Sequence, residues 1–197
     1  ILVGDTAGVV NGAANANICN GFITLCQSVG DADQVINNNA AGATPANNAA
    51  LSLSQLDQAI DKVKGSAQRG DLVILGSFAG IRAVNNALQA QQAFNDVTEI
   101  AAGFRVRTYD GIPMIVSTEV PNLFTFAANG IIQDRAGTGT CLLIMNTRYC
   151  YLSELTPTTV MPLAKTSSQF DEFDMYWDGA PVLSNTKGMS MLTNISS

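Results

Sequence analysis

The chain has 197 residues, of which 47% are hydrophobic and 13% charged, and its net charge is −6. Sequence-specific nucleic-acid binding is disfavoured, because an acidic chain with few cations lacks the clustered Lys and Arg that hold phosphates. No apolar run reaches the ~20 residues that span a membrane and no signal peptide is visible, while the absence of His removes Ser-His-Asp, Cys-His and histidine-metal sites.

The low charge has a further implication. The charged share is about half of the ~25% that is typical of soluble domains, so Asn, Gln, Ser and Thr supply much of the polar surface. Such a surface is weakly protected against association, which favours a protein that works packed against its own copies. A low-charge secreted domain is the alternative. The chain begins with Ile1 instead of Met, which indicates a processed or partial chain.

The first half of the chain predicts a loop and a helix. Residues 30–50 are polar, small and unpatterned, which is typical of a linker or exposed loop. Ser52 and Gln55 fit a capping box, and apolar residues then recur at helical spacing until Gly65. We therefore expect a helix that starts near residue 53.

A buried strand and a second helix are expected next. Residues 72–75 form the continuous apolar run of a strand that is buried on both faces. Phe78, Ile81, Val84 and Leu88 then mark the apolar side of a helix that reaches about residue 91. Ser77 is the expected N-cap of this helix.

Residues 104–118 predict a β-hairpin. The first arm alternates apolar and polar side chains, and the second arm is apolar and β-branched. Asp110 and Gly111 between them readily take positive φ, so we expect a tight two-residue turn of the primed type. Together with the helices and the buried strand, this hairpin indicates an α+β fold in which helices cover a sheet.

The later segments predict a long loop and several strands. Residues 122–140 mix aromatic, charged and glycine residues, and loops of this length are usually functional or mobile. Residues 141–146 predict a buried strand, with which residues 149–152 are expected to pair across a short turn. Further strands are expected over residues 158–163 and 170–177, before a final short apolar element.

No chemical site emerges from the sequence. The four Cys residues lack zinc-site spacing, so buried free thiols are expected and a disulfide is left open: Cys19, Cys26, Cys141 and Cys150. We expect no catalytic residue, metal or cofactor. A carboxylate-dependent hydrolase is a rival that the composition leaves open, and an adhesion module with Cys pairs is another. Asn194-Ile-Ser196 fits a glycosylation motif that also arises by chance.

Four segments, in order, resemble the major capsid protein of tailed bacteriophages, of the Hong Kong ninety-seven fold type. They are ILVGDTAG with NGFITL, DLVILGSFAGIRAVNNAL, FRVRTYDGIPMIVSTEVP and WDGAPVLSNTKGMSMLTNIS. The resemblance implies an axial domain over residues 51–163, with a central mixed sheet flanked by helices. Residues 1–50 and 164–197 would then be parts of a peripheral domain. The chain departs from the family by lacking the N-terminal arm, the extended loop and the spine helix, so we expect it to assemble poorly.

The same resemblance implies sites and partners. The loop over residues 122–140 would contact neighbouring subunits, with Phe124, Phe126, Asp134 and Arg135 as candidate contact residues. Asp110 and Gly111 would form the hairpin turn. The alternative for Phe124 and Phe126 is that both rings fold back onto the core of their own domain.

We therefore expect a structural subunit that assembles into pentamers and hexamers of an icosahedral shell around a double-stranded DNA genome. Its partners would be copies of itself and scaffolding and portal proteins, without a membrane. It would be found in the virion, after assembly in the host cytoplasm. A protein compartment of the encapsulin type is the runner-up.

Overall fold

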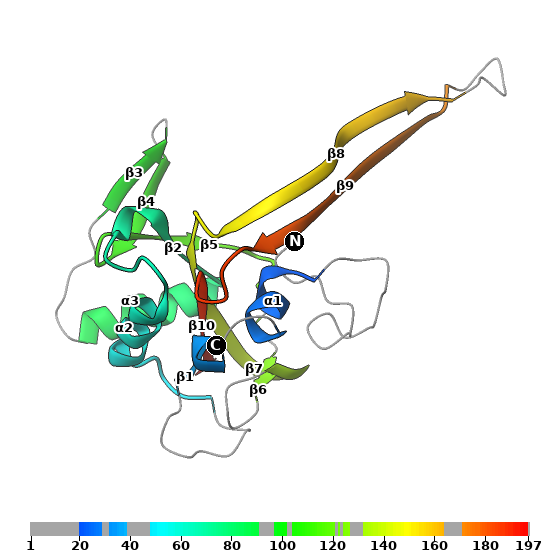
Figure 1. The fold of residues 1–197 in the computed structure, drawn as a ribbon. Coiled ribbons are helices and arrows are strands. Elements are labelled where there is room, and N and C mark those ends of the chain that lie inside the picture. Colours follow the sequence, from blue (N-terminus) through cyan, green and yellow to red (C-terminus); the bar gives the residue numbers. More distant parts are fainter. Residues whose placement is uncertain are drawn as a thin grey trace.

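A computed structural model of the chain describes residues 20–28, 32–38, 48–90, 97–101, 104–120, 122, 124–126, 132–163 and 171–196 (Figure 1). Its helices are α1 (Phe22–Ser28), α2 (Leu53–Lys62) and α3 (Phe78–Ala90), with short 3-10 helices at Ala32–Gln34 and Arg69–Asp71. Its strands are β1 (Val35–Asn37), β2 (Leu72–Gly76), β3 (Val97–Ala101), β4 (Phe104–Tyr109), β5 (Ile112–Val116), β6 (Phe124–Phe126), β7 (Ile132–Asn146), β8 (Cys150–Pro162), β9 (Phe173–Leu183) and β10 (Met189–Ser196).

A mixed sheet forms the centre of the molecule. Its strand order is β1-β10-β7-β2-β5-β4-β3, and β6 pairs with β7 beside this path. The β1–β10 and β2–β5 pairs are parallel, whereas β10–β7, β2–β7, β4–β5 and β3–β4 are antiparallel. The expected α+β class with a central mixed sheet is therefore confirmed.

Helices cover both faces of this sheet because its inner strands are apolar on both sides. On β7, Leu142 and Ile144 pack with α2 and α3 in one buried cluster, while Cys141 and Leu143 pack with α1 in a second cluster. Alternate side chains of a strand point to opposite faces, so one continuous apolar run supplies both clusters.

The two expected helix starts differ in detail. Ser77 caps α3 as predicted, because its Oγ accepts a hydrogen bond of 3.0 Å from the Gly80 backbone N–H. Ser52 lies at the N-cap of α2 but forms no capping box, since its side chain makes no cap hydrogen bond. Its backbone N–H donates instead to Asn38 Oδ1 at 2.9 Å, which ties the start of α2 to the end of β1.

The hairpin over β4 and β5 has the expected turn. Asp110 and Gly111 have φ values of 48° and 75°, and Tyr109 pairs with Ile112 across them. Two successive positive φ values define a primed two-residue turn, whose twist matches that of the flanking strands.

The strand predicted at residues 149–152 pairs elsewhere than expected. It belongs to β8, which pairs with β9 and not with β7. Both edges of β7 are already occupied, by β10 and β2. The chain therefore turns at residues 147–149 and leaves the sheet.

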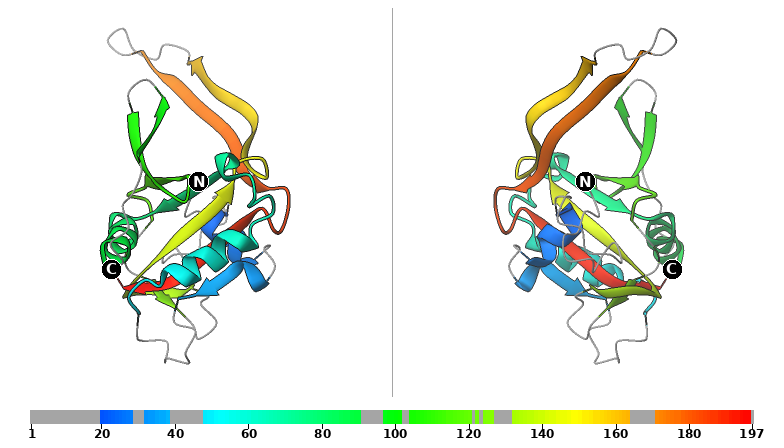
Figure 2. Two further views of the ribbon diagram at one scale, coloured as in Figure 1. Left: turned by 90° about the vertical axis from the view of Figure 1, so that its left-hand side faces the viewer. Right: turned by 90° about the vertical axis from the view of Figure 1, so that its right-hand side faces the viewer.

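β8 and β9 form a two-stranded ribbon that projects from the body in all three views (Figures 1 and 2). The expected domain boundary at residue 163 falls between its two strands. β1 and β10, both from the expected peripheral segments, pair within the central sheet. A division of the chain thus has to keep β8 with β9, and β1 and β10 with β7.

Within the described residues, no helix is long and apolar enough to cross a membrane.

Candidate functional site

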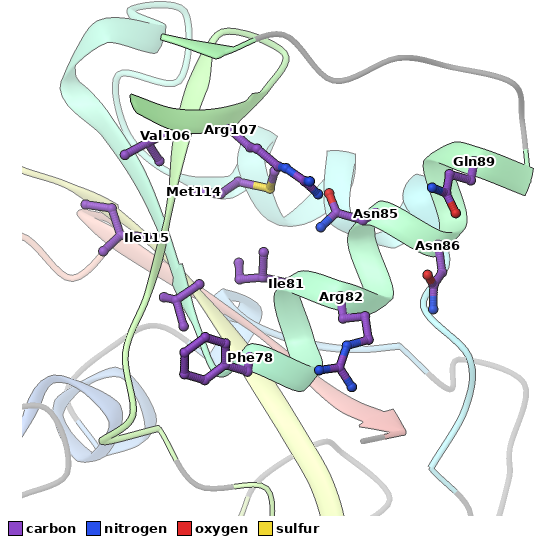
Figure 3. A pocket seen from close by; sticks show the side chains of 11 residues that line it. Phe78, Ile81, Arg82, Asn85, Asn86, Gln89, Val106, Arg107, Met114 and Ile115 are labelled. Carbon is purple, nitrogen blue, oxygen red and sulfur yellow. The ribbon is translucent and has the colours of Figure 1, made fainter. Parts of the chain in front are cut away.

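An open groove of about 570 Å³ lies between α3 and the strands β4 and β5 (Figure 3). The helix wall consists of residues that recur every three or four positions and so lie on one side of α3: Phe78, Ile81, Arg82, Asn85, Asn86 and Gln89. The strand wall comes from β4 and β5: Val106, Arg107, Met114, Ile115 and Val116.

The floor of the groove is apolar and its rim is cationic. Ile81, Val106 and Met114 are at least 93% buried. Arg82 on the helix wall and Arg107 on the strand wall are exposed, and neither has an ion-pair partner among the described residues. The groove can thus receive apolar groups that carry negative charge beside them.

Phe78 lies at the mouth of this groove. It was expected on the buried side of α3 with Ile81, but 59% of it is exposed. The residue occupies the first position of the helix after the Ser77 cap, where no preceding turn covers its ring. With Val116, which is 38% exposed, it leaves an uncovered apolar edge.

The groove lacks the residues for acid/base chemistry. A carboxylate-dependent hydrolase needs two acidic side chains that converge in a pocket, and none of the described residues that line this groove is acidic. No cluster of three potential metal ligands occurs within the described part of the chain. What the groove offers is a binding surface.

The candidate contact residues Phe124 and Phe126 lie inside the molecule. Both rings are fully buried on β6, with their centroids 5.9 Å apart at an interplanar angle of 70°. They pack in the same cluster as α1. Of the two alternatives for these rings, contact with a neighbouring subunit or packing on the core of their own domain, the structure shows packing on the core. The reason is that β6 pairs with β7 and is part of the sheet, not of a loop.

The other two candidates, Asp134 and Arg135, lie in β7. Their side chains are outside the described part of the structure.

The hairpin turn is held to the body by two polar contacts. Arg69 Nη2 lies 2.9 Å from Asp110 Oδ2, and the Tyr109 hydroxyl donates a hydrogen bond of 2.6 Å to Asp57 Oδ1 on α2. Burial, and then the negatively charged Asp57, raise the pKa of the Tyr109 hydroxyl. These contacts fix the strand wall of the groove relative to the helices.

The β8–β9 ribbon is the second exposed surface with a distinctive composition. Large apolar side chains are exposed on it, among them Leu155 at 81%, Phe173 at 63% and Met175 at 65%. Residues 150–163 and 171–183 include five acidic residues and no basic one: Glu154, Asp171, Glu172, Asp174 and Asp178. Sequence reasoning found the alternation on β9 but not the exposure of both of its faces. The signal that could have shown it is the coincidence of five acidic residues with large apolar ones over residues 150–183, where Lys165 is the one basic residue.

Three thiols gather near α1 and the sheet. Cys26, Cys141 and Cys150 are free, which matches the expectation of buried free thiols for the first two. Burial raises the pKa of Cys26 and of Cys141 to about 12 and that of Cys150 to about 11. The disulfide between Cys141 and Cys150 that an adhesion module would show is absent. Cys19 lies outside the described residues.

Asn194 is not an accessible glycosylation site. It is 2% exposed, and its Nδ2 donates to Asn37 Oδ1 at 3.1 Å. Its φ of 63° coincides with the irregular register between β10 and β7, so the residue forms a bulge in the sheet.

Comparison with solved structures finds the same fold in two other proteins. The structure of the holo-SrpI encapsulin complex from Synechococcus elongatus PCC 7942 superposes with a TM-score of 0.62 at 14% identity, covering 90% of this chain and 57% of that one. The capsid of an empty GTA particle gives a TM-score of 0.56 at 14% identity, over 96% of this chain and 60% of that one. The chain thus spans less than two thirds of the length of either. No curated protein matches it.

A match to a family model identifies the family of the chain, whereas the solved structures show its fold alone. The model of the SU10 major capsid protein matches residues 1–196. This match confirms the resemblance to phage capsid proteins that the ordered segments indicated. The chain belongs to the SU10 major capsid protein family.

Proposed function

We propose that the chain is a structural subunit of an icosahedral shell, assembled from pentamers and hexamers, that encloses a double-stranded DNA genome. The observation that carries this proposal is the family match over residues 1–196. Two further observations support it: one of the similar structures is itself a capsid, and the α3–β5 groove has an apolar floor and a cationic rim, which suit it to binding another surface.

Location and partners follow from the same proposal. The mature subunit would lie in the virion, after assembly in the cytoplasm of the host. Its main partners would be identical subunits, with scaffolding and portal proteins needed to start and size the shell. We expect no sequence-specific contacts with DNA, because an acidic chain with a net charge of −6 lacks the clustered Lys and Arg that hold phosphates.

The division into domains remains a prediction. We propose an axial part within residues 51–163, which includes both long helices and the hairpin at Asp110, and peripheral parts within residues 1–50 and 164–197. Strand pairing supports a modified version, in which the whole β8–β9 ribbon belongs to the peripheral part and β1 and β10 join β7 in the axial part.

The test is electron microscopy of the product of the complete reading frame that encodes this chain, expressed with and without a scaffolding protein. Closed particles with five-fold and six-fold capsomers are expected. Subunits that form no closed particle under any of these conditions would contradict the proposal.

A protein compartment of the encapsulin type is the second candidate. It is favoured by the higher TM-score of the encapsulin complex, 0.62 against 0.56. The content of purified particles separates the two candidates: nuclease-protected DNA in particles from infected or induced cells indicates a capsid, whereas a stoichiometric cargo protein indicates a compartment.

A further inference from the structure

The groove between α3 and β5 is an unfilled binding surface. Phe78 and Val116 leave apolar area at its mouth, and Arg82 and Arg107 bring two positive charges from opposite walls. Exposed cations beside exposed apolar area are the complement of a surface that is acidic and apolar at once.

One face of the β8–β9 ribbon has that composition. Alternation along β9 places Asp174, Tyr176 and Asp178 on the same face. Met161 lies directly opposite Asp174 in the register and so joins this face. Tyr176 is 45% and Met161 51% exposed, and both Asp side chains are exposed.

The two surfaces lie on different sides of the molecule. In Figure 1 the ribbon runs away from the body at the upper right and α3 lies at the lower left, and in Figure 2 the ribbon rises above the body while α3 lies within the body below it. A chain therefore cannot fill its own groove with its own ribbon. When two complementary patches occupy different sides of one subunit, copies join head to tail, and such contacts generate rings or extended arrays.

We propose that the acidic face of the β8–β9 ribbon of one copy docks on the α3–β5 groove of a second copy. Asp174 and Asp178 then face Arg82 and Arg107, while Tyr176 and Met161 cover the apolar mouth at Phe78. This inference rests on the proposed function and names a contact through which the shell subunits associate.

A second copy explains the groove better than a small anionic molecule does. Small-molecule sites bury roughly 70–90% of the ligand and anchor it with a few enclosed polar groups. Here the groove is open, both guanidinium groups are exposed and the mouth is apolar. A protein surface with both acidic and apolar side chains can contact the open groove, the two guanidinium groups and the apolar mouth at the same time.

A charge exchange in the full chain tests the contact. Arg82→Glu with Arg107→Glu reverses the groove, and Asp174→Lys with Asp178→Lys reverses the ribbon. Each double variant alone should weaken self-association, measured by sedimentation across a concentration series at low salt, roughly 10-fold, because two attractive pairs become repulsive. The quadruple variant restores opposite charges across the contact and should regain most of the loss.

The control exchanges charges that take no part in the contact. Asp61→Lys with Lys64→Glu lies on and just after α2, outside the groove and the ribbon, and should leave association unchanged. The four contact side chains are exposed and have no ion-pair partner in the described structure, so circular dichroism should show all variants folded.

The outcomes separate this inference from the proposed function. The docking contact is overturned if neither double variant weakens self-association. It is also overturned if the groove variant loses association and the quadruple variant does not regain it. Either result leaves the proposed shell function unaffected. If the unmodified chain stays monomeric at every concentration and its complete reading frame yields no particles, both proposals fall.

Discussion

Replacing Phe126 with Ala should destabilise the folded subunit strongly. The ring is fully buried on β6 and meets the ring of Phe124 edge to face, with centroids 5.9 Å apart. Truncation leaves a cavity between the sheet and α1 that the surrounding side chains fill only in part.

The expected loss follows from this environment. Phe→Ala substitutions in cores cost about 3–5 kcal/mol, of which an edge-to-face ring pair accounts for about 0.5–1.5 kcal/mol. For a chain of this size, each kcal/mol lowers Tm by about 2–4 °C, so we expect a decrease of about 6–20 °C. Phe126→Leu keeps more of the volume and should cost clearly less.

Urea unfolding followed by circular dichroism measures the free energy of unfolding of each variant. The matched control is Phe78→Ala, the same substitution at a ring that is 59% exposed, which should cost at most about 1 kcal/mol. Its main effect should appear in self-association.

Equal costs at the two positions, or a loss below about 1 kcal/mol for Phe126→Ala, would refute the burial argument. Unchanged stability with weakened association would return Phe126 to the role of an inter-subunit contact residue.

Four further predictions have defined outcomes. Ser77→Ala removes the cap bond to Gly80 and the 2.9 Å bond to Thr140, and should lower the free energy of unfolding in urea by about 1–2 kcal/mol; a neutral result would contradict the capping role. Gly111→Ala should cost about 1–2 kcal/mol because φ is 75° there, whereas Gly70→Ala, with no atom within 4 Å of the added Cβ, should be close to neutral. The Cys26 and Cys141 thiols, whose pKa values burial raises from 9.0 to about 12, should resist Ellman's reagent at pH 8 until urea unfolds the chain. Because the folded pKa values are the higher ones, their effect on stability is absent below about pH 9 and reduces stability as the pH rises from about 9 towards 12; a urea midpoint that is equal or higher at pH 10 than at pH 8 would contradict this sign.

Local chemistry allowed β2 and the β4–β5 hairpin of the sheet to be predicted. Asp110 and Gly111 specify their turn without help from the rest of the chain, because two positive φ values are accessible to few residue pairs. The apolar run at residues 72–75 required burial on both faces wherever the strand lay. These features depend on neighbouring residues only, and the structure has them as expected.

Long-range pairing could not be predicted in the same way. Residues 149–152 follow β7 after a short turn, and hairpin pairing is the natural expectation for such a sequence. Residues 149–152 do not pair with β7 because β10 and β2, which come from distant parts of the chain, are hydrogen-bonded to its two edges. No local pattern near residue 150 contains that information.

The candidate contact residues reveal the same limit. The Gly-rich and polar surroundings of Phe124 and Phe126 indicate a loop and leave open whether the rings are exposed or buried, and pairing with β7 buries them. Phe78 fits the apolar stripe of α3 and is nevertheless largely exposed. Exposure depends on which element covers a residue, and the two walls of the groove are about 30 residues apart in the chain.

The position of β10 has a consequence for how the subunit is made. This strand lies between β1 and β7, and Val35 on β1 pairs with Met191 on β10. During synthesis, β10 leaves the ribosome after every other described strand of the sheet. Until then β1 has no partner among the described strands, and β7 can pair only with β2 and β6. Pairing over such a sequence distance is slow, and apolar strands that wait for a partner tend to aggregate. Newly made subunits should therefore depend on chaperones. Because the sheet is complete only after β10 has paired with β1 and β7, subunits that can assemble should appear with a delay after synthesis.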